Sequence, residues 1–201
     1  MIASTKKRLA APARQDSILS AAISEFAHAG YDRTRVADIA SKVAVTEPVV
    51  FQNFGTKAHL FARVLERATD ELLGYLQVIH EHTHGVDELV AAILDHEHQD
   101  RLHSHGGLGL IFADASERSE PSIRQAARRA HRRTTEAVAM LLRRGQREGT
   151  IRKDIDAATL AGLVLSQIHA RQFRRLHGET SATLERDVRA AVLAALRPQH
   201  D

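Results

Sequence analysis

The sequence predicts an all-α protein, with a small N-terminal helical head and a larger C-terminal helical bundle. Three observations lead to this. Apolar residues recur at helical spacing along nearly the whole chain. Val and Ile are scattered rather than alternating, and aromatic residues are only 4% of the 201 residues, which disfavours a β-sandwich or barrel. Gly and Pro stand where helices of this kind end or begin.

The first four helices are short or sharply bounded. Apolar residues at helical spacing from Ile18 to Phe26 predict a first helix that stops at Gly30. A short second helix covers residues 36–43, and a third of about two turns covers residues 47–54. Thr56 is placed to cap a long fourth helix that carries apolar residues as far as Ile79.

Further helices are expected in the C-terminal part of the chain. Their predicted ranges are residues 86–102, 107–116, 121–147, 156–177 and 181–196. Gly85, Gly149 and Gly178 separate three of these segments, and Pro121 suits the first turn of the longest one. We therefore expect one N-terminal domain over residues 11–65 and one C-terminal domain over residues 66–201.

Composition excludes several classes of protein. No apolar run approaches the ~18 residues that a membrane-spanning helix needs, and the basic N-terminus lacks the apolar core of a signal peptide. The chain has no cysteine, so it has no disulfide, no thiolate nucleophile and no cysteine-based metal site. A cytoplasmic protein without a membrane partner is the expectation.

The positive charge is concentrated in the N-terminal third. Residues 1–63 contain nine Lys and Arg against five Asp and Glu, whereas residues 64–201 contain 19 against 20. This asymmetry favours a polyanionic partner for the N-terminal part, although basic helix faces also serve solubility alone.

The segment Val36–Phe54 has the size of a helix-turn-helix. Ala44, Val45 and Thr46 would form the turn, with Thr46 capping the next helix and Pro48 in its first turn. Such a unit packs one helix on its scaffold and places the next in the DNA major groove. A generic three-helix core with no DNA-binding role has the same spacing and remains the alternative.

The stretch GYDRTRVADIASKVAVTEPVVFQNFGTKAHLF resembles the signature of the TetR-type (tetracycline-repressor-like) transcriptional regulators. The resemblance covers about residues 14–65. Its matching positions are Phe26, Gly30, Tyr31, Thr34, Val36, Asp38, Ile39, Ala40, Val45, Thr46, Phe51, Phe54, Lys57 and Leu60. It implies a homodimeric repressor that a small-molecule effector releases from a palindromic double-stranded DNA operator. Such a protein is not an enzyme and needs no cofactor.

The resemblance also implies roles for individual residues. Lys57, in the first turn of the fourth helix, would hold a phosphate, because free N–H groups gather at a helix N-terminus. Further expected phosphate contacts are Thr34, Arg35, Thr46 and Thr56. The expected base-facing or groove-lining residues are Glu47, Val49, Gln52 and Asn53. For Gln52 and Asn53, the alternative to a base contact is that they are simply exposed to solvent.

Three positions depart from the family pattern. The turn usually has Gly where this chain has Ala44, and the reading helix usually has Tyr where this chain has Phe51, which removes a hydroxyl. Arg35 replaces a Ser or Thr cap and is expected to contact phosphate instead. The N-terminal residues Lys6, Lys7, Arg8 and Arg14 form either an arm on the DNA backbone or an idle tail.

The effector pocket should lie among the fourth to eighth helices. The expected lining is Tyr75, Leu76, Ile79, Leu89, Ile93, His96, Leu110, Phe112, Met140, Leu141, Gln167 and Phe173, each of which also suits an ordinary core. For the dimer interface, we expect apolar rows on the last two helices, formed by Leu160, Val164 and Ile168 and by Leu184, Val188 and Val192.

A function of another class would use the histidines. Seven of the 13 fall between His80 and His105, and His80 and His84 have a spacing that suits a metal on a helix face. A helical metal-binding protein or enzyme is therefore the alternative to a regulator. However, the chain has no cysteine that could serve as a further ligand, and no metal site is predicted. The run of arginines from Arg124 to Arg133 most simply forms a solvated face, and a second nucleic-acid surface is its alternative.

Overall fold

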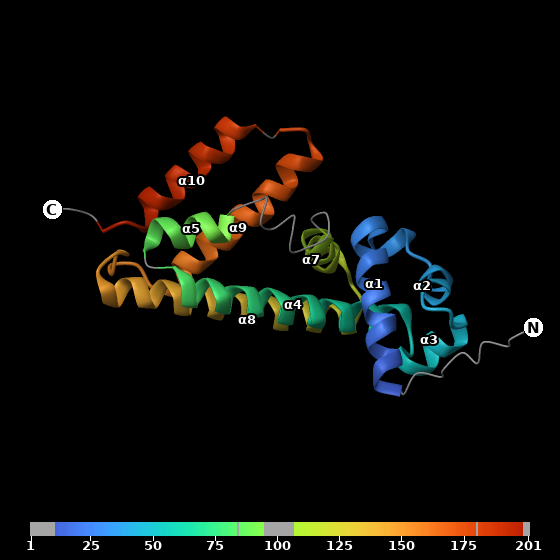
Figure 1. Cartoon of the computed structure of the whole chain (residues 1–201). Coiled ribbons are helices and arrows are strands. Elements are labelled where there is room, and N and C mark those ends of the chain that lie inside the picture. Colours follow the sequence, from blue (N-terminus) through green and yellow to red (C-terminus); the bar gives the residue numbers. More distant parts are fainter. Residues whose placement is uncertain (1–10, 84, 95–106, 180, 199–201) are drawn as a thin grey trace, which may run out of the picture.

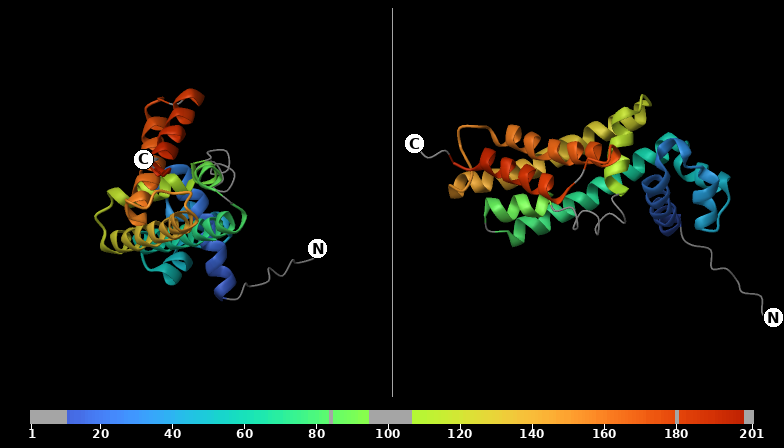
Figure 2. Two further views of the ribbon diagram at one scale, coloured as in Figure 1. Left: turned by 90° about the vertical axis from the view of Figure 1, so that its left-hand side faces the viewer. Right: turned by 90° about the horizontal axis from the view of Figure 1, so that it is seen from above.

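The computed structural model describes residues 11–83, 85–94, 107–179 and 181–198, and within these it describes only the backbone of residues 107–110, 172, 175 and 176. These residues form helices and no strands, as the sequence predicts. A head lies at one end of an elongated body (Figure 1, and Figure 2, right). The head comprises α1 (Ala11–Arg33), α2 (Val36–Lys42), α3 (Glu47–Phe54) and the start of α4 (Lys57–His82).

The body is built on two long helices that run side by side, α4 and α8 (Pro121–Glu148). The shorter helices of the body are α5 (Val86–Leu94), α7 (Gly107–Glu117), α9 (Ala157–Leu176) and α10 (Ala182–Leu196). In Figure 1, α5, α9 and α10 lie above the α4–α8 pair, whereas α7 lies beside α1 at the junction with the head.

The helix boundaries have local causes. The Thr56 hydroxyl accepts a hydrogen bond from the backbone N–H of His59 at 3.1 Å, which caps α4 as predicted. Ser181 caps α10 in the same way through the N–H of Leu184. Pro121 lies in the first turn of α8, and Gly149 ends that helix in the left-handed conformation.

Two apolar cores hold these helices. The first is centred on Phe26, Tyr31 and Phe61, and it includes Ile111 of α7 and Ile123 of α8. Because this core contains residues from both parts, the head packs on the junction end of the body. The second core fills the space among α4, α5, α8, α9 and α10.

The first helix stops at Gly30 as predicted, because the Gly30 backbone is non-helical (φ 76°), and α1 includes a further turn beyond it that continues to Arg33. The predicted and observed elements differ at one place. The helix predicted over residues 86–102 is observed as α5 up to Leu94, and the rest of that range lies outside the described residues. No helix in the described part of the chain has the length and apolar character needed to cross a membrane.

Candidate nucleic-acid interface and ligand hollows

The turn between α2 and α3 is held by the backbone. Ala44 has φ 53°, the only non-glycine residue with positive φ among those described. This conformation lets the N–H of Val45 donate to the carbonyl of Ala40 at 3.0 Å. The left-handed geometry that a glycine usually provides is thus kept here with an alanine.

Helix α3 has one buried side and one side facing solvent. Val50 is buried against the head, whereas Glu47, Phe51 and Gln52 are exposed. Val49 and Asn53 are half-buried, and the Asn53 amide donates to the carbonyl of Val49 at 2.7 Å. The free side of α3 therefore presents Glu47, Phe51 and Gln52 and is open to a partner as large as double-stranded DNA.

The three threonines expected at phosphates differ in position. Thr56 is exposed at the start of α4, and Thr46 is exposed at the start of α3, although its side chain makes no capping bond. Thr34 is buried, and its hydroxyl donates to the carbonyl of Gly30 at 2.7 Å. Because its side chain lies inside the head, Thr34 has a structural role, which corrects the expectation of a phosphate contact.

Arg35 lies at the surface and forms a two-bond ion pair with Asp38, with both N–O distances 2.9 Å. This hydrogen-bonded pair lowers the pKa of the Asp38 carboxyl and raises that of Arg35. A phosphate contact by Arg35 would have to compete with Asp38. Of the expected N-terminal arm, only Arg14 lies within the described residues.

Lys57 occupies the first turn of α4, beside the C-terminal end of α1. Its ammonium donates to the carbonyl of Asp32 at 3.3 Å and lies 4.7 Å from the centre of the Tyr31 ring. Partial burial lowers the pKa of Lys57, an effect that the nearby Asp32 carboxylate opposes. The cation is thus oriented by the head itself at the end of α4 where free N–H groups gather.

A set of contacts that the sequence analysis did not foresee joins the head to the body. We call Asp32, Tyr31, Asp114 and Arg118 the head–body clamp. Arg118, just after α7, donates to both oxygens of Asp32 at 2.7 and 2.8 Å, although 86 residues separate them. The Arg118 guanidinium also stacks over the Tyr31 ring, with 5.0 Å between its carbon and the ring centre.

Asp114 of α7 explains why Gly30 is a glycine. Its carboxylate accepts a hydrogen bond of 2.6 Å from the backbone N–H of Tyr31. A Cβ on Gly30 would lie 3.1 Å from the same oxygen, at a backbone conformation that side chains avoid. The sequence held one signal for this contact, since a glycine at a helix end allows a left-handed backbone and a close approach by another group.

The clamp also sets the charge state of its members. The hydrogen bonds from Arg118 lower the pKa of the Asp32 carboxyl. Burial, followed by the Glu120 carboxylate, raises the pKa of the Tyr31 hydroxyl, so Tyr31 stays neutral at ordinary pH. The end of the head that faces the body is therefore a neutralised ion pair beside an uncharged phenol.

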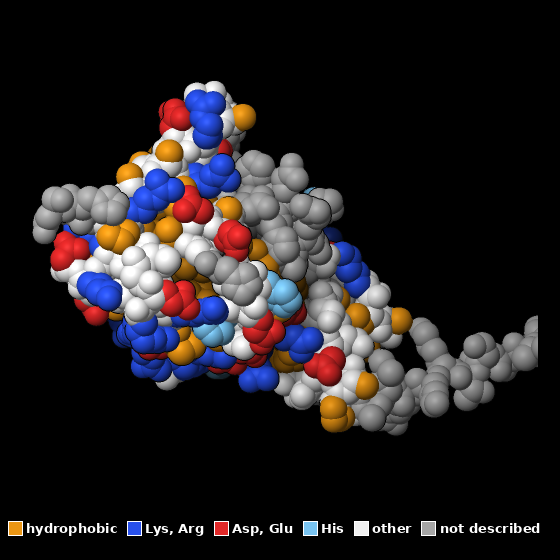
Figure 3. Space-filling model, turned by 60° about the vertical axis from the view of Figure 1, so that its left-hand side comes forward, with side chains coloured by type: hydrophobic (Ala, Val, Ile, Leu, Met, Phe, Trp, Pro, Cys, Tyr) orange, Lys and Arg blue, Asp and Glu red, His pale blue; other side chains and the backbone are white. Residues whose placement is uncertain are grey.

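Two of the hollows among the described residues of the body are each large enough for a small ligand. The first, of about 710 Å³, is a groove between α4 and α8. Three residues expected in the effector pocket line it, namely Leu76, Met140 and Leu141, and Arg132 and Arg147 lie at its rim. Figure 3 shows that Lys and Arg side chains gather over the lower part of the face of the molecule in that view.

The second hollow, of about 360 Å³, lies between α5, α9 and α10. Its apolar wall includes Leu94, Ile168 and Val188. Of the residues expected in the effector pocket, Gln167 lines this hollow. Arg171 and Arg174 project into it from α9 beside Glu185 of α10. We call this the α5–α9–α10 hollow.

The other residues expected in the effector pocket are not brought together. Ile79, Leu89 and Ile93 are buried in the body core, and the Tyr75 hydroxyl donates to the carbonyl of Ala92 at 2.9 Å. Phe112 packs on the head core, and Phe173 is 62% exposed. The side chain of Leu110 and all of His96 lie outside the described residues.

Within the described residues, no group of three or more His, Cys, Asp or Glu side chains is arranged to hold a metal. His80 and His82 are described, and His82 contacts the carbonyl of Val78. His84, His96, His98, His103 and His105 lie outside the described residues.

Part of the α8 arginine run joins α8 to α4. Arg129 pairs with Glu66 at 2.6 Å, and Arg133 pairs with Asp70 at 2.8 Å.

The rows expected at a dimer interface face mostly inward. Leu160, Val164 and Val192 are buried in the protomer's own core, and Ile168, Leu184 and Val188 are half-buried. The exposed side of the pair instead carries Leu163, Ser166 and Phe173 on α9 and small residues on α10, namely Ala190, Ala191 and Ala194. Helices α9 and α10 therefore do have an exposed apolar surface, but it is formed by other residues than the predicted rows.

Comparison with known proteins agrees with this arrangement. Residues 18–64 match the family model of the bacterial regulatory proteins of the tetR family, and residues 97–198 match that of the SbtR-like transcriptional regulator C-terminal domain. The HTH-type transcriptional activator FasR of Mycolicibacterium smegmatis is 30% identical over 144 residues. That alignment covers 68% of this chain and 62% of FasR, so the chain spans about three fifths of this relative's length.

Solved structures share the fold. FadR from Bacillus subtilis, in complex with stearoyl-CoA, has a TM-score of 0.74 at 15% identity, with 90% of this chain and 98% of that chain covered. A TetR-family regulator from Agrobacterium tumefaciens has a TM-score of 0.76 at 17% identity, with 92% and 98% covered. The two family matches and the helix-turn-helix head lead to one conclusion: the chain belongs to the TetR family of transcriptional regulators.

Proposed function

We propose that the protein is a homodimeric regulator that binds a palindromic double-stranded DNA operator in the cytoplasm and represses transcription until a small-molecule effector releases it. The single observation that carries this proposal is the exposed side of α3, with Gln52 free to reach bases, next to Lys57 at the start of α4. A glutamine amide suits a paired contact with adenine, and a cation at a helix N-terminus suits a phosphate. The function requires no catalysis and no cofactor.

The proposed dimer forms through the exposed side of α9 and α10. Leu163 is 37% exposed and Phe173 62% exposed, although both are large and apolar. Beside them, the alanines of α10 would let two copies of each helix approach closely around a two-fold axis. The two heads would then meet two half-sites of a palindrome, which is the reason to expect a palindromic operator.

The proposed effector binds in the body. FadR has the same fold and holds stearoyl-CoA, a ligand with an anionic end and an apolar tail. Both hollows of this body combine apolar walls with arginines, which suits a ligand of that general character. Its binding would reach the head through the head–body clamp and α4, because these are the contacts that join the two parts.

The proposal is tested by selecting double-stranded DNA from a random library with the full-length protein. The expected result is a palindrome of two half-sites. The control is Gln52→Ala with Lys57→Ala, which should retain less DNA and lose the base preference at two mirrored positions of the palindrome. Enrichment of no sequence by the unmodified protein would contradict the proposal.

The direction of regulation is tested with the selected operator in front of a reporter gene. Repression predicts that expression rises when the gene for this protein is deleted. FasR is an activator, and a fall in expression on deletion would assign activation here and overturn repression.

A further inference from the structure

Asp32 offers two different acceptors to two cations at the junction of head and body. Lys57 of the head donates to its main-chain carbonyl at 3.3 Å, whereas Arg118 of the body donates to both oxygens of its carboxylate, at 2.7 and 2.8 Å. The two cations also share the Tyr31 ring, at 4.7 and 5.0 Å from its centre. Lys57 and Arg118 are therefore neighbours, and the charge of the Asp32 carboxylate is taken by Arg118.

The Asp32 carboxylate can turn towards Lys57 when Arg118 does not hold it. It belongs to the residue whose carbonyl Lys57 already contacts, so only rotations about its side-chain bonds separate the two arrangements. The Asp32 side chain is 71% exposed, so little packing opposes such a rotation, whereas the Arg118 side chain is only 20% exposed. The fixed member of the ion pair is thus the arginine of the body, and the movable member is the aspartate of the head.

The charge of Lys57 responds to both neighbours. Burial lowers the pKa of Lys57 most, the Asp32 carboxylate raises it, and the Arg118 guanidinium lowers it. A carboxylate turned towards Lys57 would offset the charge that attracts a DNA phosphate, and it would itself repel that phosphate. A carboxylate that Arg118 neutralises does neither.

From these contacts we propose that Arg118 is a positioning residue for the DNA contact of Lys57: by holding the Asp32 carboxylate, it keeps the Lys57 ammonium available to a phosphate. The inference deepens the proposed function and rests on it, because it takes Lys57 as a DNA contact. Arg118 follows α7, so this contact depends on where the body holds the end of α1. A shift of α7 away from α1 would release Asp32 to Lys57 and weaken the hold on DNA without any change in α3.

A double-mutant cycle on the full-length protein tests the proposal. Affinity is measured for the selected operator and for a mixed-sequence duplex, because a phosphate contact carries no sequence information. We expect Arg118→Gln to weaken both at least about fivefold at low salt, and less at high salt, where the freed charge is screened. Asp32→Asn should bind DNA at least as tightly as the unmodified protein. Added to Asp32→Asn, Arg118→Gln should change the affinity by less than about twofold.

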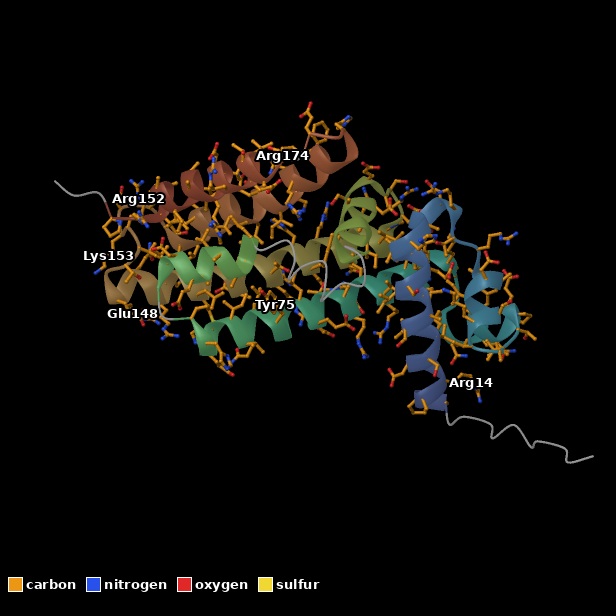
Figure 4. All side chains as sticks on the ribbon, turned by 45° about the horizontal axis from the view of Figure 1, so that its top comes forward. Arg14, Tyr75, Glu148, Arg152, Lys153 and Arg174 are labelled. Carbon is orange, nitrogen blue, oxygen red and sulfur yellow. The ribbon has the colours of Figure 1, made fainter. Side chains whose placement is uncertain are left out.

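Two controls separate this role from general support of the junction. Arg152 forms a similar two-bond pair with Asp154, and Figure 4 shows Arg152 at the end of the body that is far from Arg14 of α1. Arg152→Gln removes the same charge and should leave both affinities unchanged. Arg118→Lys keeps a cation beside Asp32, so it should recover most of the affinity that Arg118→Gln loses.

A second readout needs no DNA. The pKa of the Lys57 ammonium is measured by NMR of the full-length protein labelled at lysine. Arg118→Gln should raise this pKa, because the released carboxylate stabilises the ammonium and a neighbouring cation is gone. The rise should be smaller when Asp32→Asn is also present. If Arg118→Gln does not fold, Asp32→Asn alone decides, since it should lower the pKa of Lys57 without weakening DNA binding.

The opposite results contradict the proposal. If Arg118→Gln weakens DNA binding equally with and without Asp32→Asn, Arg118 does not act through Asp32. If Asp32→Asn loosens DNA binding, the carboxylate helps Lys57 instead of competing for it, which also overturns the proposal. If the unmodified protein binds no DNA, the proposed function fails and this inference fails with it. If it binds DNA but the cycle shows no coupling, this inference alone is wrong.

Discussion

The methyl group of Ala44 lies at a backbone conformation that L-residues avoid. At φ 53° the Cβ crowds the following carbonyl, at a cost of roughly 1–2 kcal/mol. Ala44→Gly removes that cost. It also gives the unfolded chain more conformational freedom, which lowers the free energy of unfolding by roughly 0.4–1 kcal/mol. We therefore expect a variant as stable as the unmodified protein or up to about 1.6 kcal/mol more stable.

Urea unfolding measures this change, and the matched control is Ala37→Gly. Ala37 is exposed within α2, so its glycine should lower the free energy of unfolding by about 0.5–1 kcal/mol. A comparable loss at both positions would show that Ala44 is not strained. The departure from glycine was visible in the sequence, but only the structure shows that the turn keeps its left-handed geometry with alanine.

At the scale of single elements, α7 fixes the head through Asp114. Replacing it by alanine leaves the N–H of Tyr31 without its acceptor, and a lost bond to a half-buried donor costs about 1–3 kcal/mol. Asp114→Ala should therefore speed hydrogen exchange in residues 31–40 and destabilise the head by that amount. Glu117→Ala, exposed on the same helix, should change stability by less than about 0.5 kcal/mol. Similar exchange in both variants would mean that the clamp does not hold the head.

Sequence patterns predicted the elements better than the contacts between them. The start of α3 follows from Pro48 in its first turn, although Thr46 at the N-cap position does not make the predicted capping bond. The start of α4 follows from Thr56, which does make it, because such a signal lies within one turn of the boundary that it sets. The clamp could not be predicted in this way. Asp32 and Arg118 are 86 residues apart, and each reads as an ordinary surface charge until the fold brings them together.

At the scale of the whole molecule, the same limit applies to burial. Helical spacing showed that Val164 lies on an apolar row, but it did not show whether that row faces the protomer's own core or a partner. The buried row belongs to the core, because α9 packs on α8. A partner must use the opposite side, where Leu163 and Phe173 are exposed.

The proposed dimer is tested by Leu163→Glu. A charge on this exposed side should not disturb the protomer, but it would be buried without a counter-ion in a two-fold interface, which is strongly unfavourable. We expect a folded monomer with weak operator binding. The control is Val78→Glu, since Val78 is 51% exposed on α4 and should leave a dimer. Light scattering at micromolar concentration decides, and a monomeric unmodified protein or a dimeric Leu163→Glu would contradict the interface.

The central claim is that the head reads DNA with two kinds of contact, and a salt titration combined with a single-base scan of the selected operator tests it most directly. Lys57→Ala should weaken binding to every sequence alike and reduce the slope of log affinity against log salt by about one for each lost contact. Gln52→Ala should keep the slope and lose about 1–3 kcal/mol of preference at two mirrored positions of the palindrome. If both variants lose only salt-dependent affinity that is the same for all sequences, α3 does not read bases through Gln52, and the account is wrong at its centre.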